Sequence, residues 1–182
     1  MILVLALAAA DDYATLAKEA ISTAEKVRGL QAKGPIRTEV TGREAIERYV
    51  TERIAKTDAR SSFALTQAAL LAFGLTDEPY DVEGLVRRVA RDQIAGYYDW
   101  EKKTLYVANW IPPYLQKPTL VHEATHALQD QYFGIGRFME PIMGCSEPST
   151  AVASLLEGDA TVAMLDALAG TPVDASSGEK MV

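Results

Sequence analysis

Residues Leu120–Leu128 read LVHEATHAL, and this stretch contains both histidines of the 182-residue chain. His122 and His126 are four residues apart, and Glu123 directly follows the first of them. Random placement of two histidines rarely produces this arrangement, so a motif of the HExxH form is favoured over two histidines on a helix surface. The flanking residues predict a buried helix, which is the rigid support that a metal site needs. They are Leu120, Val121, Ala124, Ala127 and Leu128.

The helical spacing of this motif indicates zinc chemistry. Residues four apart on a helix differ by about 40° in direction, so His122 and His126 project from one face. Two imidazoles from adjacent turns can share one zinc ion. Glu123 lies about 100° around the helix from His122, where it can reach a metal-bound water as a general base but is poorly placed as a third ligand. The motif therefore predicts two ligands and a base, and it requires another ligand.

The third ligand is sought among the downstream carboxylates, because the chain has no other histidine and Cys145 is a lone thiol on an expected loop. Glu157 is the best candidate, since its apolar neighbours in VASLLEGDATVAM favour burial and an unpaired buried carboxylate costs several kcal/mol. Gly158, a poor helix former, favours close packing against another helix. The alternative is that Glu157 is partly exposed or bound to an arginine. The other candidates are Asp130, Glu140, Glu147, Asp159 and Asp166.

The composition is that of an ordinary globular protein, with 48% hydrophobic and 24% charged residues. The net charge of −7 and the pI near 4.9 argue against a nucleic-acid partner, because phosphate contacts need clustered Lys and Arg. No internal apolar run has the length of a membrane-spanning helix, so no stable membrane span is expected. Cys145 is the single cysteine and cannot form an internal disulfide. We expect one domain over residues 11–170.

The two ends of the chain differ from this domain. Residues 1–10 read MILVLALAAA and resemble the apolar core of a secretory signal that ends in small residues, without the basic leader. We expect a truncated signal segment and therefore an exported protein, periplasmic or extracellular; an apolar turn of helix is the alternative. The polar residues 171–182 are expected to form a mobile tail.

The remaining patterns predict a mainly helical α+β domain with a small sheet. A capping box from Thr41 to Glu44 is expected to begin the second helix. The predicted helices are Asp11–Lys33, Thr41–Lys56, Ala59–Phe73, Asp81–Gln93, Pro118–Gly134 and Ser149–Leu168, with a loop over residues 136–148. The predicted strands are Ile36–Val40 and the two arms of a β-hairpin, Ile94–Asp99 and Thr104–Val107, joined by the polar residues 100–103.

Three motifs in this order resemble a family of zinc metallopeptidases. They are GYYD…LYV at Gly96–Val107, HEATHALQDQY at His122–Tyr132 and LLEGDA at Leu155–Ala160. HExxH followed by a helix with glutamate, glycine and alanine resembles the gluzincins, whose third zinc ligand is a glutamate on that later helix. A closer likeness is to uncharacterised bacterial, mostly exported metallopeptidases. The likeness covers roughly residues 91–168.

This resemblance implies a zincin-like fold and an enzyme that hydrolyses peptide bonds in a peptide or protein substrate. One Zn²⁺ per chain would be held by His122, His126 and Glu157. Glu123 would activate a zinc-bound water as the nucleophile. The hairpin would offer an edge strand to an extended peptide, although a hairpin that only packs on the helices is the alternative.

The chain departs from the family pattern at supporting positions. Thermolysin-like relatives place an aspartate one turn after the ligand glutamate, where it can orient a histidine, and this chain has Thr161 there. Asp130, one turn beyond His126, is a candidate hydrogen-bond partner of a ligand imidazole, and a solvent-exposed Asp130 is the equal alternative.

Relatives also stabilise the oxyanion with a downstream histidine or tyrosine, and here only tyrosines are available. Tyr98 and Tyr132 are the preferred candidates, ahead of Tyr97 and Tyr106. The missing support leaves a second hypothesis, a catalytically inactive zinc-binding protein that acts as a binding or scaffold module. A purely structural zinc site is disfavoured, because it would have no use for Glu123.

Overall fold

The computed structural model describes residues 2–57, 59–143 and 145–170, and its backbone divides into two compact units. Unit 1 comprises residues 1–40 and 95–182, and unit 2 comprises residues 41–94. The predicted fold class is confirmed: the chain is mainly helical α+β with one small mixed sheet of three strands. Among the residues described, no helix combines the length and apolarity needed to cross a membrane. The predicted tail lies outside the described residues.

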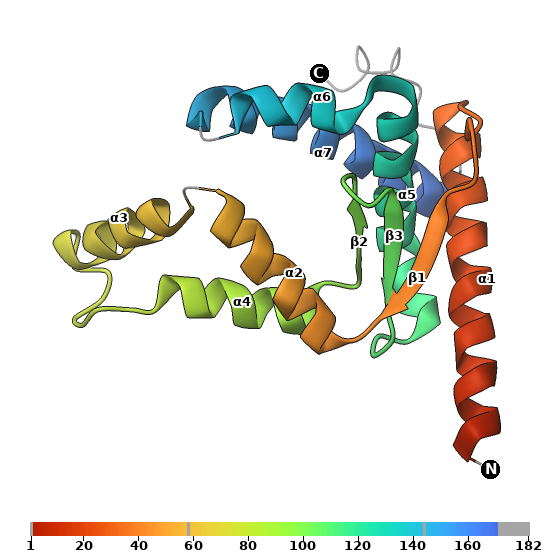
Figure 1. The fold of residues 1–182 in the computed structure, drawn as a ribbon, viewed down its shortest axis with the longest axis horizontal. Coiled ribbons are helices and arrows are strands. Elements are labelled where there is room, and N and C mark those ends of the chain that lie inside the picture. The colour runs from red at the N-terminus through yellow and green to blue at the C-terminus, as the bar shows by residue number, and fades with distance from the viewer. Residues whose placement is uncertain (1, 58, 144, 171–182) are drawn as a thin grey trace. The chain divides into compact units, whose positions relative to one another are not determined.

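Most elements are helices; one strand follows α1, and a hairpin lies between α4 and α5 in the chain (Figure 1). Unit 1 begins with the long helix α1 and strand β1 and resumes with a hairpin and three further helices. Its elements are α1 Ile2–Arg28, β1 Arg37–Thr41, β2 Gly96–Asp99, β3 Thr104–Ala108, α5 Pro113–Phe133, α6 Ile135–Met139, the 3₁₀ turn η1 Glu140–Ile142 and α7 Ser146–Ala169. Unit 2 consists of α2 Arg43–Lys56, α3 Ala59–Ala72 and α4 Val82–Gln93.

The sheet has the strand order β1-β3-β2, which leaves β2 at an edge. β2 and β3 form the predicted antiparallel hairpin, with Tyr98 opposite Leu105 and Asp99 opposite Thr104. The Asp99 carboxylate accepts hydrogen bonds from the backbone N–H groups of Glu101 and Lys102, at 2.9 and 3.2 Å, which stabilises the connection. The hairpin was predictable because aromatic and β-branched residues flank a short polar segment.

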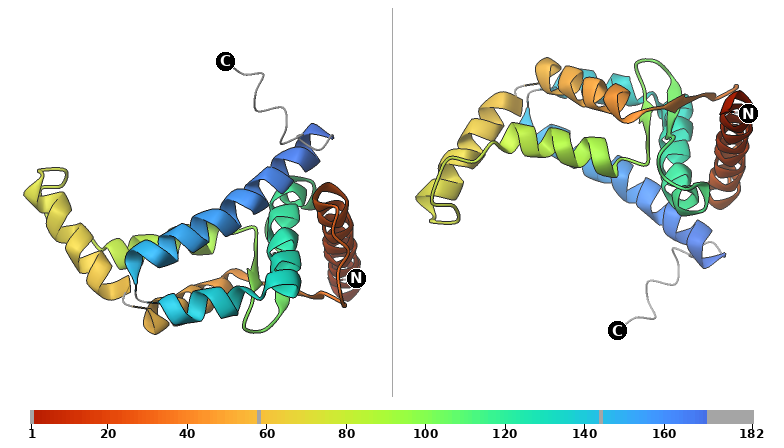
Figure 2. Two further views of the ribbon diagram at one scale, coloured as in Figure 1. Left: turned by 90° about the horizontal axis from the view of Figure 1, so that it is seen from above. Right: turned by 90° about the horizontal axis from the view of Figure 1, so that it is seen from below.

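Helix α5 lies between α1 and α7 in unit 1 (Figure 2) and also packs on the hairpin. Small side chains on facing helices let the backbones approach closely. Helices α1 and α5 each contribute one stripe at helical spacing to a continuous core. The core residues are Tyr13, Leu16, Ala17, Ala20 and Ala24 from α1, Leu120, Val121, Ala124, Ala127 and Leu128 from α5, and Tyr98, Leu105 and Val107 from the hairpin.

The start of α5 differs from the prediction, because the helix begins at Pro113 and passes through Pro118. Proline is favoured in the first helical turn, where its missing N–H would be unpaired in any case. Gln116 then anchors this early turn: its fully buried amide donates hydrogen bonds to the carbonyls of Ala95 and Ala108, at 3.0 and 2.7 Å. These contacts hold the first turns of α5 at the end of the hairpin.

Other predicted boundaries also need correction. The expected capping box is wrong: Thr41 is buried at the end of β1, and Gly42 is the N-cap of α2 without a side-chain hydrogen bond. α1 begins at Ile2 rather than Asp11 and ends at Arg28, followed by Gly29 with φ of +62°. Much of the expected loop over 136–148 is helical, in α6, η1 and the first turn of α7. The signal segment and export stay predictions.

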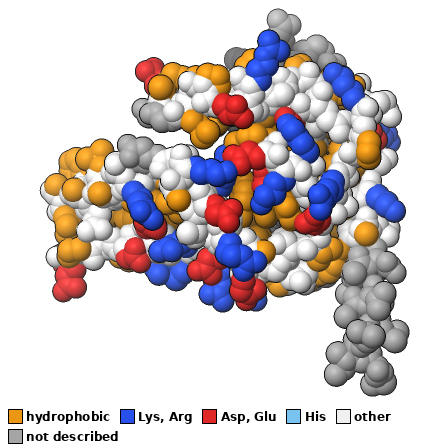
Figure 3. Space-filling model, in the orientation of Figure 1, with side chains coloured by type: hydrophobic (Ala, Val, Ile, Leu, Met, Phe, Trp, Pro, Cys, Tyr) orange, Lys and Arg blue, Asp and Glu red, His pale blue; other side chains and the backbone are white. Residues whose placement is uncertain are grey.

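Unit 2 is lightly packed. Ile46 and Ile54 are its buried hydrophobic side chains among the residues described, and α3 has no buried residue. The helix predicted to start at Asp81 is α4, and Asp81 is its N-cap: the carboxylate accepts the backbone N–H of Gly84 at 2.8 Å. Apolar side chains are exposed over and after α3 (Figure 3), including Leu65, Phe73 and Leu75.

Candidate metal centre

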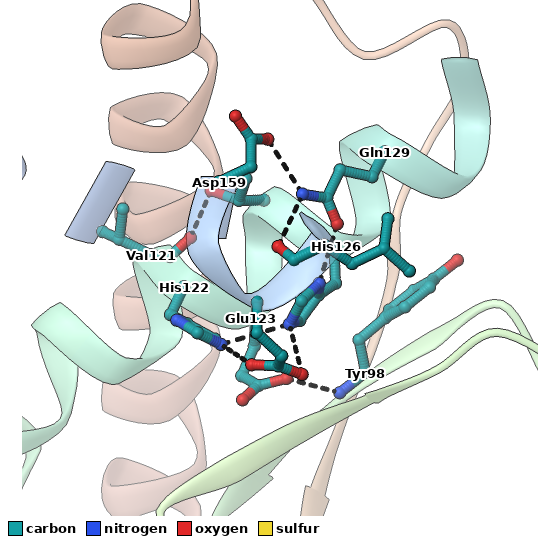
Figure 4. A network of polar contacts seen from close by, with 10 residues as sticks. Tyr98, Val121, His122, Glu123, His126, Gln129 and Asp159 are labelled. Atoms are coloured by element: carbon teal, nitrogen blue, oxygen red, sulfur yellow. Dashed lines mark hydrogen bonds and ion pairs between the residues drawn. The ribbon is translucent and has the colours of Figure 1, made fainter. Parts of the chain in front are cut away.

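Helices α5 and α7 bring together three side chains that could hold a metal ion, and Figure 4 labels two of them, His122 and His126. The Nε2 atoms of His122 and His126 are 3.1 Å apart. The Glu157 carboxylate completes the cluster, with Oε2 3.0 Å from His122 Nε2 and Oε1 3.5 Å from His126 Nε2. All three residues come from the predicted ligand set.

These distances are compatible with those between the ligand atoms of a tetrahedral zinc ion. Around a tetrahedral zinc with bonds of about 2.0–2.1 Å, two ligand atoms are separated by about 3.3 Å. The separations of 3.0 to 3.5 Å in this cluster lie around that value. The two imidazole side chains are 15% and 12% exposed, so the cluster is open to solvent mainly on the Glu157 side. Nitrogen and carboxylate oxygen donors are those that zinc accepts in proteins.

Glu157 reaches the cluster from an exposed position, which contradicts the predicted burial. Its side chain is 61% exposed, and beyond its chain neighbours and its own helix backbone no atom of the described residues lies within 4 Å of where a Cβ on Gly158 would be. The expected close packing at Gly158 is therefore also wrong. Hydrogen bonds with His122 and His126 hold the pKa of the Glu157 carboxyl far below its usual range, so it is an anion in this arrangement.

Glu123 lies beside the cluster without belonging to it. Its Oε2 accepts the backbone N–H of Tyr98 at 2.9 Å, so α5 is connected here to the edge strand β2. Burial raises the pKa of the Glu123 carboxyl, and the nearby charges of His126 and His122 and the Tyr98 N–H oppose that rise. A carboxylate beside the cluster, held by the Tyr98 N–H, is in a position from which it can accept a proton.

His126 has a hydrogen-bond partner that the sequence analysis missed. Its Nδ1 lies 2.8 Å from Oε1 of Gln129, a buried residue three positions further along α5. Burial lowers the pKa of His126, but the hydrogen bond to Glu157 and the charge of Glu123 outweigh this effect and raise it. The contact could have been predicted from the sequence, because Gln129 follows His126 by three positions and residues three apart on a helix are neighbours.

Asp130 does not contact an imidazole, and the predicted hydrogen bond to a ligand histidine is wrong. It is also not solvent-exposed, since its side chain is 1% exposed. The carboxylate accepts hydrogen bonds from the Tyr98 hydroxyl at 2.7 Å, from Lys103 Nζ at 2.7 Å and from the backbone N–H of Ile135 at 2.9 Å. Asp130 therefore anchors the hairpin and the start of α6 to α5.

The preferred tyrosines have hydroxyl groups that are engaged outside the cluster. The Tyr98 hydroxyl donates to Asp130, and burial raises the pKa of this phenol. The Tyr132 hydroxyl donates to the carbonyl of Gln31 at 2.8 Å. Tyr97 and Tyr106 stack on one another across the hairpin, with ring centroids 4.7 Å apart. These contacts give Tyr98 and Tyr132 structural roles, and an oxyanion role for either stays a prediction.

Comparison with known proteins returned no family model, curated protein or solved structure that matches this chain.

Proposed function

We propose that this protein is a zinc-dependent peptidase in which His122, His126 and Glu157 hold the metal. The observation that carries the proposal is the convergence of the two Nε2 atoms and the Glu157 carboxylate at 3.0 to 3.5 Å, with Glu123 alongside. A bound zinc would supply Lewis-acid chemistry, lowering the pKa of a coordinated water to about 7 and polarising a carbonyl.

The chain's own residues transfer the proton, orient Glu123 and bind the peptide. The Glu123 carboxylate accepts a proton from the attacking water and delivers it to the leaving amine, a role that its raised pKa favours. The Tyr98 N–H orients Glu123 through its 2.9 Å hydrogen bond. β2 is an edge strand next to this carboxylate, which supports an extended peptide as the substrate, bound through backbone hydrogen bonds.

The function is tested with Glu123→Gln. Purified wild-type protein should contain about one zinc per chain and hydrolyse unstructured peptides, because one site of this type binds one ion. Glu123→Gln should keep the zinc, since Glu123 is outside the ligand cluster, and lose at least about 100-fold in turnover, the lower range for a general base. Metal analysis and a peptide-cleavage assay measure both quantities.

Three control variants make this test specific. Glu140→Gln, at an exposed position on η1, should change neither zinc content nor turnover. His122→Ala and His126→Ala should each abolish zinc binding. Full zinc retention in both histidine variants would contradict the site, and cleavage by Glu123→Gln at the wild-type rate would contradict the mechanism.

One observation favours a second function, a zinc-binding module without peptidase activity. The Tyr98 and Tyr132 hydroxyls are engaged by Asp130 and Gln31, so neither supplies a donor for an oxyanion in this arrangement. In that case wild-type protein and Glu123→Gln would bind zinc alike, and neither would cleave peptides.

A further inference from the structure

We propose that Gln129 is a positioning residue that holds His126 as the Nδ1–H tautomer, and that Asp159 fixes the orientation of the Gln129 amide. This inference rests on the proposed metal site, but it concerns the chain's own hydrogen bonds. Gln129 comes from α5 and Asp159 from α7, and both are labelled above the two histidines in Figure 4.

The hydrogen bonds around Gln129 determine which way its amide faces. Nε2 donates to the carbonyl of Leu156 at 3.0 Å and to Oδ2 of Asp159 at 2.8 Å. Both partners are acceptors, so the NH₂ group has to occupy that side. Oε1 then faces His126 Nδ1 at 2.8 Å, and an oxygen can only accept there. Nδ1 of His126 therefore has the proton.

This tautomer suits a metal ligand. With the proton on Nδ1, neutral His126 has its free lone pair on Nε2, the atom that faces His122 and Glu157. Hydrogen bonds of this kind orient the ligand ring and raise its basicity, and their loss typically costs about 10–100-fold in metal affinity. Gln129 is 3% exposed, so water does not readily replace it.

Asp159 extends this chain of contacts to a third helix. Its Oδ1 forms an ion pair with Nη2 of Arg28, the last residue of α1. The carboxylate is thus held from one side while its other oxygen accepts from Gln129. A series of side-chain contacts therefore connects α1, α7 and α5 to the proposed metal-binding nitrogen. It runs from Arg28 through Asp159 and Gln129 to His126.

Imidazole NMR tests the tautomer directly, because the chain has only two histidines. We would record ¹⁵N spectra of metal-free, histidine-labelled protein above both imidazole pKa values, as determined by titration in the same spectra. Wild-type His126 should have its proton on Nδ1. Gln129→Met, which removes both hydrogen-bonding groups at similar volume, should shift the proton toward Nε2 and lower zinc affinity by about 10–100-fold.

Gln131→Met is the matched control, because Gln131 lies on the same helix and its amide bonds to the backbone of Lys33 and Gly34, away from the histidines. It should change neither the tautomer nor the zinc affinity. The double variant Gln129→Glu with Asp159→Asn restores an acceptor for Nδ1 and a donor for that acceptor, but it places a carboxylate oxygen beside the Leu156 carbonyl. It should recover the Nδ1–H tautomer and part of the zinc affinity.

Several outcomes would overturn the inference. They are a wild-type His126 with its proton on Nε2, an unchanged tautomer in Gln129→Met, and an equal loss of zinc affinity in Gln131→Met. If Gln129→Met does not fold, Asp159→Ala takes its place, since the Asp159 side chain is 31% exposed and both imidazoles are retained. It should shift the tautomer in the same direction, and no shift would overturn the role of Asp159. The spectra need neither zinc nor substrate, so failure of the peptidase proposal would be seen separately.

Discussion

Glu157 contacts both imidazoles although 61% of its side chain is exposed. A carboxylate in this position loses little hydration, so its contact with the histidines has only a small desolvation cost. It can therefore remain charged without a metal and still provide an oxygen to one. The burial inferred from its apolar neighbours is not required for a ligand role.

This exposure leads to a prediction for Glu157→Gln. Zinc affinity should fall by more than about 100-fold, beyond the effect of losing an outer hydrogen-bond partner, because a charged donor is removed. The free energy of unfolding of the metal-free protein should change by less than about 1 kcal/mol, since exposed ion pairs contribute little. Zinc titration and urea denaturation measure the two effects.

Glu147→Gln provides the comparison, as Glu147 lies in the first turn of the same helix and outside the cluster. It should leave zinc affinity unchanged. Equal affinities for the Glu157 and Glu147 variants would remove Glu157 from the ligand set.

Tyr98 contacts α5 at two points. Its backbone N–H bonds to Glu123, and its hydroxyl bonds to Asp130, seven residues further along the helix. Tyr98→Phe removes only the second contact and leaves the buried Asp130 with one donor fewer. It should destabilise the protein by about 1–3 kcal/mol, the usual range for a hydrogen bond to a buried charge, and leave zinc content unchanged. Thermal or urea unfolding with metal analysis tests both points.

Tyr132→Phe is the appropriate control, because its hydroxyl bonds to a carbonyl in an exposed setting. Its cost should be less than about 1 kcal/mol. A loss of zinc in Tyr98→Phe would instead place the hydroxyl in the metal site.

At the scale of elements, the contact between the hairpin and α5 depends on Gly96. A Cβ at this position would lie 2.8 Å from the carbonyl oxygen of Tyr106 and 2.9 Å from Cδ2 of Leu120. The glycine therefore lets β2 approach both its partner strand and the helix that contains the histidines. Because Glu123 bonds to the same strand, this close approach also affects the site.

Alanine substitutions at two glycines should have opposite effects. Gly96→Ala should destabilise the protein by about 1–3 kcal/mol, because the hairpin or Leu120 has to move. Gly158→Ala should stabilise it by up to about 1 kcal/mol, since the position is helical, exposed and free of neighbours within 4 Å. Urea denaturation compares the two. If Gly96→Ala stabilised the protein instead, β2 would have more space at Gly96 than these distances indicate.

At the scale of the whole molecule, the proposed site belongs to unit 1, and unit 2 contributes none of its residues. The units also differ in burial. Unit 1 has a continuous core formed by α1, α5 and the hairpin, whereas α3 of unit 2 has no buried residue. Local opening is easiest where few apolar contacts resist it.

Hydrogen exchange on the intact chain should reflect this difference. Amides of α3 should exchange faster than those of α5 in the metal-free protein. Zinc at about 100 times its dissociation constant should add up to about 2.7 kcal/mol to the protection of α5 and α7, because the ion binds only the folded site. Mass-spectrometric exchange with and without zinc provides the measurement. Equal protection of α3 and α5, or no zinc effect on α5, would contradict this expectation.

The sequence alone determined the features that depend on neighbours along the chain. Helical geometry places His122 and His126 on one face at a spacing of four, and the structure has their Nε2 atoms 3.1 Å apart. The hairpin and the start of α4 at Asp81 also follow from local preferences, and both were predicted correctly. Helix boundaries were less predictable. The sequence predicts that α5 starts at Pro118, whereas the helix begins at Pro113, where tertiary hydrogen bonds of Gln116 support its first turns.

Only the tertiary structure decided the partners of the polar side chains. Asp130 and Gln129 are adjacent on α5. The sequence offered Asp130 as a candidate partner of the imidazole, with a solvent-exposed Asp130 as the equal alternative, but Gln129 has that contact while Asp130 faces the hairpin. Adjacent residues on a helix differ by about 100° in direction, so their partners depend on which elements pack on each side. Here α7 lies on one side and β2 on the other, and that packing is set by the core rather than by local sequence.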